Sequence, residues 1–278
     1  QTSEHSQTSE HSQTSEHSQT SEHSQASEHS QASDLNEFLC YDGHELVGYM
    51  GICSFGGSEM EINGMVHPEH RRKGIFSELH RRVLQEMSRR GTTSVLLLCD
   101  ANSEEGLHFI DKIGASYQKS EYEMIADLKA LPADESNHTL RLRKACNQDS
   151  AEINQQNALY FNCDLDEVER TLPEEEEKRG FHIYLASSGD DIVGKVNLHF
   201  LDHEVGIYGL GIKPEFRGQG LGKQLLRKSL SIIKAEGSQR AMLQVEAEND
   251  TALNLYIKSG FKLRSTMKYF TFSHSDVL

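Results

Sequence analysis

One block of sequence occurs twice in this chain, 146 residues apart, and it restricts the possible folds more than any other feature. Residues 67–76 align with residues 213–222, and each copy follows an apolar segment and opens a segment with helical periodicity. Solenoid repeats have periods of roughly 20 to 50 residues, far shorter than this one. The sequence therefore predicts a duplicated domain.

The second copy of this block holds a glycine-rich loop made of Arg217, Gly218, Gln219, Gly220, Leu221 and Gly222. The start of a helix offers unpaired backbone amides and a partial positive charge, which together favour a bound anion. The three glycines let the backbone approach such an anion without intruding side chains, and the arginine adds charge. The loop therefore predicts a phosphate site, although a glycine-rich turn between a strand and a helix can also be only a turn.

Periodicity predicts a mixed α/β (α+β) chain, because apolar residues recur every three or four positions in some segments and alternate in others. In the first half we expect strands at 37–41, 45–53, 61–66, 94–98 and 122–125, helices at 74–90 and 103–113, and a linker at 131–137. In the second half we expect strands at 140–142, 181–186, 192–200, 205–212 and 241–246, two closing strands, and helices at 150–160, 165–178, 221–235 and 250–258. The four glutamates after Pro173 fit the first turn of an exposed helix better than an acceptor site.

The first thirty residues are a six-residue sequence, Gln-Thr-Ser-Glu-His-Ser, written five times with one Thr-to-Ala change. This segment has no apolar residue larger than alanine, so burial cannot offset its ordering entropy. We expect residues 1–34 to be disordered and their histidines to belong to a polar spacer with no metal role. The predicted domains are then 35–130 and 138–278.

The second half resembles the GNAT superfamily of N-acetyltransferases, and the two-copy layout resembles its tandem members such as mycothiol synthase. The resemblance depends on the strand, the glycine-rich loop and a downstream block that contains Asn249, Ala252, Tyr256, Gly260 and Phe261. It covers residues 138–275, here called the second copy, and more weakly residues 37–128, the first copy. It implies two tandem domains, each a mixed, mostly antiparallel twisted sheet flanked by helices.

The resemblance also implies the roles of particular residues. Acetyl-CoA would be the co-substrate, with its pyrophosphate on the 217–222 loop and its pantetheine arm on exposed backbone groups of Leu210, Gly211 and Ile212. Tyr256 would protonate the departing thiolate. Glu204 would be the general base or only a solvated acid at a strand end, with Glu246 as the second candidate. Asn249 would bind the cofactor or cap the helix that follows it.

The first copy departs from this pattern at several positions. At the constant offset, Phe76 replaces Gly222 and Ser58 replaces Glu204, while Phe109 and Ile110 occupy the two possible counterparts of Tyr256. The opening strand and helices of the second copy have no apparent counterpart in the first. We therefore expect a structural or regulatory first copy, although the basic residues Arg71, Arg72 and Lys73 could still attract an anion.

These features predict an acyl-CoA-dependent N-acyltransferase that acetylates a primary amine of a small molecule or peptide; the alternative is a catalytically silent acyl-CoA-binding or interaction module. The net charge of −15 falls to −8 without the seven acids among residues 1–37, which argues against a nucleic-acid partner. We expect no metal, since the five cysteines are scattered, and no membrane span or signal peptide. The expected protein is cytoplasmic and a monomer or homodimer.

Overall fold

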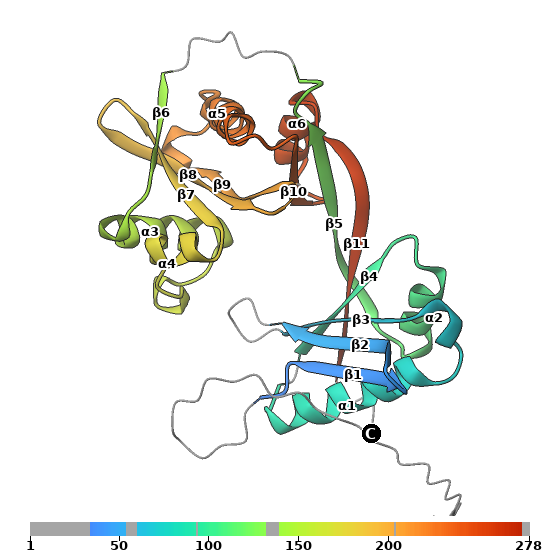
Figure 1. The fold of residues 1–278 in the computed structure, drawn as a ribbon. Helices are drawn as coiled ribbons and strands as arrows, with labels where there is room; N and C mark the ends of the chain where they lie inside the picture. Colours follow the sequence, from blue (N-terminus) through green and yellow to red (C-terminus); the bar gives the residue numbers. More distant parts are fainter. Residues whose placement is uncertain (1–33, 54–59, 93, 132–138, 203, 274–278) are drawn as a thin grey trace, which may run out of the picture. The chain divides into compact units, whose positions relative to one another are not determined.

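The computed structural model describes residues 34–53, 60–92, 94–131, 139–202 and 204–273 (Figure 1). The disorder expected for 1–33 and most of the expected linker lie outside these residues, as does Ser58. The chain forms two compact units: unit 1 holds Gln1–Ile52 with Asn63–Gly91, and unit 2 holds Cys53–Ile62 with Thr92–Leu278. The predicted domain limits at 35–130 and 138–278 stay a prediction.

Unit 1 combines an antiparallel hairpin with one amphipathic helix. Strands β1 (Glu37–Asp42) and β2 (Glu45–Cys53) pair, and a short 3₁₀ turn (Pro68–His70) precedes helix α1 (Ile75–Arg89). The helix buries Leu79, Val83 and Met87 on one face, as the apolar spacing predicts.

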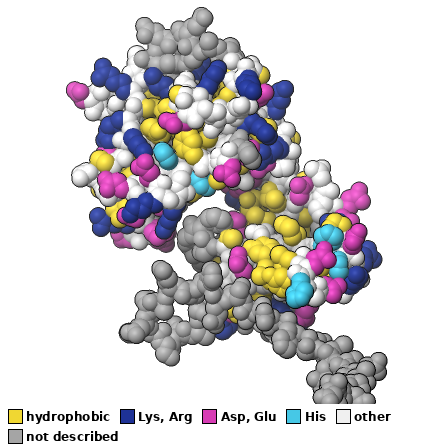
Figure 2. Space-filling view, in the orientation of Figure 1, with side chains coloured by type: hydrophobic (Ala, Val, Ile, Leu, Met, Phe, Trp, Pro, Cys, Tyr) yellow, Lys and Arg dark blue, Asp and Glu magenta, His cyan; other side chains and the backbone are white. Residues whose placement is uncertain are grey.

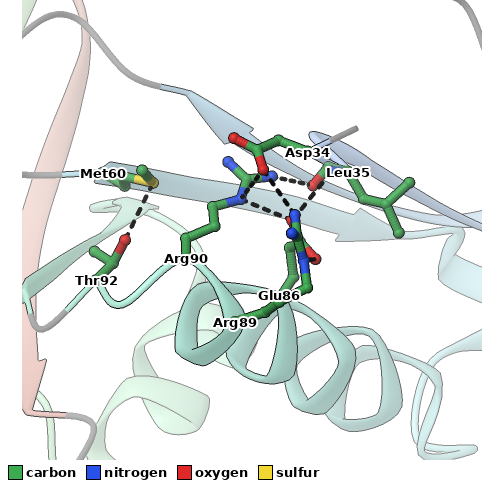
Figure 3. Close-up of polar contacts among 7 residues, drawn as sticks. All are labelled: Asp34, Leu35, Met60, Glu86, Arg89, Arg90 and Thr92. Carbon is green, nitrogen blue, oxygen red and sulfur yellow. Dashed lines mark hydrogen bonds and ion pairs between the residues drawn. The ribbon is translucent and has the colours of Figure 1, made fainter. Parts of the chain in front are cut away.

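The first residues of the described chain are fixed to the end of α1 by a cluster of ion pairs (Figure 3). The Glu86 carboxylate accepts hydrogen bonds from the Leu35 backbone amide at 3.1 Å and from Arg89 and Arg90 at 2.6 and 2.8 Å. Arg89 also donates to Asp34 at 2.7 Å. Hydrogen bonds from Arg89, together with those from Arg90 and Leu35, lower the pKa of Glu86 to about 2.

Unit 2 is built on one mixed sheet with the strand order β3-β4-β11-β5-β10-β9-β8-β7-β6. Its strands are β3 (Met60–Val66, of which 60–62 belong to this unit), β4 (Ser94–Asp100), β5 (Ser116–Asp127), β6 (Leu140–Lys144), β7 (Phe181–Ser188), β8 (Asp191–Phe200), β9 (Val205–Ile212), β10 (Arg240–Glu246) and β11 (Lys262–Ser273). Its helices are α2 (Glu104–Lys112), α3 (Ser150–Phe161), α4 (Pro173–Lys178), α5 (Leu221–Ala235) and α6 (Asp250–Lys258), with 3₁₀ turns at Asn147–Asp149, Leu165–Glu167 and Pro214–Phe216.

The duplication is visible in the element bounds. Helices α1 and α5, helices α2 and α6, strands β4 and β10, and strands β5 and β11 all begin and end 146 residues apart, which is the offset of the sequence repeat. The mixed α/β fold with two tandem copies is therefore confirmed.

The last strands of the two copies are exchanged within the unit 2 sheet. Strand β5 pairs antiparallel with β10 on one side, and β11 pairs antiparallel with β4, while β5 and β11 lie side by side (Figure 1). The registers are reciprocal: Ser94 pairs with Ser273, and the same positions 146 residues away, Arg240 and Asp127, also pair. Each copy thus completes the sheet of the other.

Two sequence expectations about these strands are wrong. The strand expected at 122–125 spans Ser116–Asp127, and the two closing strands are one strand, Lys262–Ser273. Each strand is paired over its whole length, because β5 and β11 pair with each other at one end and with β10 or β4 at the other. The partner strands here come from the other copy, which local alternation in the sequence does not reveal.

The helix expected at 165–178 is also wrong. The structure has a 3₁₀ turn at Leu165–Glu167 and a separate short helix α4 that starts at Pro173. Proline lacks an amide hydrogen and its ring clashes with the preceding turn, so it fits the first position of a helix but not the interior. Glu174 and Glu175 are exposed in the first turn, as expected.

The core of unit 2 lies where α5 and α6 cover one face of the sheet, and α3 and α4 lie on the opposite face (Figure 1). Leu225, Leu226 and Ile233 of α5 are fully buried against it. In the visible faces of Figure 2, acidic and basic side chains are interspersed. Among the described helices, none is long and apolar enough to cross a membrane.

Candidate functional site

Strands β9 and β10 diverge after three residue pairs, and this divergence defines the candidate site. They pair in parallel only from Val205–Ala241 to Ile207–Leu243. Beyond that point β9 remains hydrogen-bonded to β8 alone, where Ile212 lies opposite Gly194. The backbone edge of residues 208–212 that faces β10 is therefore outside the β-ladder, and Leu210, Gly211 and Ile212, the residues expected to bind the pantetheine arm, lie in this segment.

A β-bulge turns the backbone of β9 at this point. Gly209 and Leu210 together lie opposite the single residue Val196 of β8. Gly209 has a φ of +52°, which is left-handed and favours glycine. A side chain there would also meet the Lys195 amine, because an added Cβ would lie 2.9 Å from its Nζ.

The loop that follows β9 presents its backbone at the start of α5. Gly218 and Gly220 have φ values of +78° and +77°, and residues 217–220 are exposed. Leu221 is buried in the core and anchors the first turn of the helix. The Arg217 amide is used within the turn, where it donates to the Pro214 carbonyl at 3.1 Å, so the anion-binding amides would be those of residues 218–222 at the positive end of α5.

Arg217 is held against the strand that precedes the loop. Its Nε donates to the carbonyl of Ile212 at 2.9 Å, although the residue remains exposed. This hydrogen bond fixes the shape of the loop and leaves the guanidinium at its edge. Gln219 is also exposed, whereas Gly222 is partly buried with space for a Cβ at ordinary contact distance from Ile212 and Leu255.

Tyr256 projects from α6 into the apolar core. It is 8% exposed, and its ring lies 5.9 Å from that of Phe261. Within the described parts of the chain, no residue forms a hydrogen bond with its hydroxyl. Burial raises the pKa of Tyr256, which keeps the hydroxyl protonated at neutral pH.

Asn249 caps the same helix. Its Oδ1 accepts a hydrogen bond from the Ala252 amide at 3.1 Å, the usual geometry of an N-cap residue. The capping interpretation is confirmed, and a contact with a cofactor stays a prediction.

Glu204 is clamped by an arginine. Arg264 donates to both carboxylate oxygens of Glu204, at 2.8 and 3.2 Å, and to Glu123 of β5 on its other side. The arginine lowers the pKa of Glu123. Glu123 belongs to the first copy and reaches this place because β5 is inserted next to β10. The structure therefore gives Glu204 a structural partner that the sequence did not indicate.

The second candidate base, Glu246, lies on the same face of the sheet. It is directly opposite Glu121 of β5, and Lys119 bridges the two carboxylates at 3.2 and 3.0 Å. Tyr269 donates a hydrogen bond to Glu121 at 2.7 Å, and its burial is the main cause of its raised pKa. Glu246 is 56% exposed, so it is the more accessible of the two candidates.

Sequence reasoning missed a buried polar cluster behind the bulge. Lys195 is fully buried on β8, and the ring of Tyr160 of α3 covers Gly211 so closely that an added Cβ would clash with it. The Tyr160 hydroxyl donates to Gln156 at 2.8 Å. A lysine at an alternating strand position is normally read as solvent-facing; only the coverage of β8 by α3 on this face shows otherwise.

The first copy keeps the loop geometry but not its side chains. Arg71 donates to the carbonyl of Val66 at 3.2 Å, as Arg217 does to Ile212, and Gly74 has a φ of +83°. Arg72 adopts the left-handed conformation, with a φ of +63°, in the place of Gly218. In the described ranges, no group of three or more metal-ligating side chains comes together.

Comparison with known proteins agrees with this geometry. The family model described as Acetyltransferase (GNAT) family matches residues 4–115 and 150–261. Both limits of the second match lie 146 residues after those of the first. The two matches together span well over half of the chain.

Individual relatives cover different shares of the chain. A mycothiol acetyltransferase of Streptomyces coelicolor is 26% identical over 244 residues, which are 82% of this chain and 76% of that protein. A putative ribosomal protein bS18 alanine N-acetyltransferase of Bacillus subtilis is 30% identical over 98 residues, 35% of this chain, and the match spans 65% of its length. The crystal structure of a GCN5-related N-acetyltransferase from Sphaerobacter thermophilus superposes with a TM-score of 0.72 at 18% identity, over 86% of this chain and 81% of that one.

Proposed function

Because this chain belongs to the acetyltransferase (GNAT) family, with a match in each half, we propose that its second copy transfers an acetyl group from acetyl-CoA to a primary amine of a small molecule or peptide. The neutral amine attacks the thioester carbonyl directly. A C–N bond forms, the C–S bond breaks, the nitrogen loses a proton, and the coenzyme A thiolate gains one.

The observation that carries this proposal is the open edge of β9, which leads directly into the glycine loop of α5. A pantetheine arm laid along that edge would extend the sheet, with backbone groups of Leu210, Gly211 and Ile212 as its hydrogen-bonding partners. An amide aimed at the thioester oxygen would stabilise the negative charge that develops there, a contribution of several kcal/mol in other acyl-transfer enzymes. The diphosphate would then reach the amides of residues 218–222, with the Arg217 side chain adding positive charge.

Tyr256 is the proposed general acid. Its side chain is the buried ionisable group of α6, and burial raises its pKa further above neutrality, so the hydroxyl holds a proton that it can donate. The thiolate that leaves the tetrahedral intermediate would take this proton.

Glu204 is the proposed general base, with Glu246 second. Arg264 makes three hydrogen bonds to the two carboxylate oxygens of Glu204, so an acceptor ammonium or a bridging water must approach the lone pairs that remain. The two candidates lie in one polar cluster, because Arg264 joins Glu204 to Glu123 and Glu246 lies opposite Glu121 on the same strand, β5.

Thiol release from acetyl-CoA, measured over a panel of primary amines with the full chain, tests the proposal. We expect thiol release with at least one amine class and acetylated product in equal amount. Acetyl-CoA binding without turnover on any amine would instead support a silent acyl-CoA-binding module.

A further inference from the structure

The buried polar cluster behind the bulge has a role in the proposed acetyl transfer, on which this inference rests, and the residue concerned is Lys195. Its side chain has 0% exposure, and no described carboxylate lies within ion-pair distance of it. Lysine is almost never fully buried without a partner, because removing an ammonium from water is costly. The free-energy cost of burying Lys195 on β8, beside the β9 strand that is proposed to bind the acyl donor, therefore points to a functional role.

The contacts of the ammonium are with the bulge itself. Nζ donates to the carbonyl of Gly209 at 3.5 Å and to Oδ1 of Asn197 at 3.3 Å. The ring of Tyr160 lies 5.9 Å away, within the range of a cation–π contact. The carbonyl of Gly209 belongs to the extra residue of the bulge, where the regular ladder between β8 and β9 is interrupted.

The bulge sets the direction in which the next backbone groups point. It comprises Gly209 and Leu210, shortly after the last β10-paired residue, Ile207, and so lies at the start of the segment 210–212. We propose that Lys195 is a positioning residue for the acyl donor: its ammonium holds the Gly209 carbonyl and thereby fixes the orientation of the 210–212 backbone toward the bound thioester. Because its amine is fully buried, it acts through β9 and not by contact with substrate.

The positioning role depends on the positive charge of Lys195, whereas a role in packing alone does not. Desolvation lowers the pKa of Lys195 to about 8. A charged donor makes a hydrogen bond roughly twice as strong as a neutral one. The hydrogen bond from Lys195 to the Gly209 carbonyl therefore weakens as the amine loses its proton.

The surroundings of Lys195 are otherwise almost free of titrating groups. From β7 the facing residue is Leu185, and from β9 the facing residue is Gly211. From α3, Tyr160 faces it with a pKa raised by burial, and Glu152, about two turns away on the same helix, is already paired with Lys213 at 2.7 Å. On β8 itself, His199 is four residues away on the same face and stacks on Phe181.

Calorimetry with a non-hydrolysable thioether analogue of acetyl-CoA tests the inference, with the full chain at pH 7, 8 and 9. We expect the wild-type Kd to rise at least about threefold from pH 7 to pH 9, with tenfold as the limit set by the protonated fraction. Lys195→Met should bind more weakly at pH 7 and show no rise. Lys234→Met, at an exposed position near the end of α5, should keep the wild-type rise.

Hydrogen exchange gives a readout that needs no ligand. At pH 7 we expect the 205–212 segment to exchange faster in Lys195→Met than in wild type, with the segment of α5 unchanged. If the methionine variant does not fold, Lys195→Arg replaces it, because arginine stays charged up to pH 9 and its Kd should not rise.

Two results would overturn the inference. One is a wild-type Kd that stays constant from pH 7 to pH 9, and the other is a folded Lys195→Met that binds the analogue as wild type does at every pH. Either result leaves the proposed acetyl transfer intact, whereas wild type that fails to bind the analogue at pH 7 removes both.

Discussion

The loop before α1 in the first copy and the loop before α5 in the second have nearly the same backbone and very different side chains. Each has a 3₁₀ turn, an arginine bonded to the end of the preceding strand, and a left-handed glycine before a helix of 15 residues. The first copy then places Phe76 where the second has Gly222, and Ile110 where the second has Tyr256. Since the arginine contact persists without the other site residues, we interpret it as a folding contact. Backbone geometry alone therefore does not distinguish the two loops, whereas their side chains do.

The largest expected effect comes from giving the second loop the side chain of the first. Gly222→Phe should weaken acetyl-CoA binding by at least about a thousandfold, because a benzyl group would displace several charge-assisted amide contacts. Calorimetry measures this. Gly222→Ala is the matched control, since a Cβ fits there at 3.9 Å from Ile212 and Leu255. Wild-type affinity in folded Gly222→Phe would place the phosphates elsewhere.

The second comparison concerns the acid. Tyr256→Phe keeps the aromatic packing and removes the hydroxyl, so kcat should fall about a hundredfold with acetyl-CoA affinity changed less than about twofold. Steady-state kinetics and calorimetry on the same preparation measure both. Equal losses in kcat and in affinity would mean that the hydroxyl contributes to binding and not to proton transfer.

A smaller effect is expected for the two candidate bases, Glu204 and Glu246, which lie among residues from both copies. Glu204→Gln should lower kcat/KM for the amine about tenfold, more than Glu246→Gln does, because the amide cannot take a proton. The reverse order would assign the base to Glu246. Glu123→Gln is a useful control, since it removes the other carboxylate that holds Arg264.

The smallest effect on activity is expected in unit 1. Glu86→Gln should leave turnover unchanged and lower the free energy of unfolding by about 2 kcal/mol at pH 7, because Arg89 and Arg90 lose a charged partner. The pKa of Glu86 is depressed to about 2, so this stability is present above the ordinary pKa of 4.5 and is lost as pH falls toward 2. Chemical denaturation at both pH values measures it; an equal difference at pH 2 would contradict the ionic explanation.

Sequence patterns located the elements that carry local signals. Helices α1 and α5 begin and end within a residue of the expected ranges, since apolar spacing and flanking glycines mark them. The glycine loop was placed for the same reason. The Arg264 clamp on Glu204 and the burial of Lys195 could not be predicted, because both depend on which strand or helix lies beside a given face. A period of two tells which residues share a face but not what covers it.

The crossed final strands make each half depend on the other for its sheet. A chain cut to residues 138–278 would leave β10 and β11 separated by the width of the missing β5, with two unsatisfied hydrogen-bonding edges exposed to aggregation. The second copy therefore depends on the final strand of the first, whatever chemistry the first copy carries.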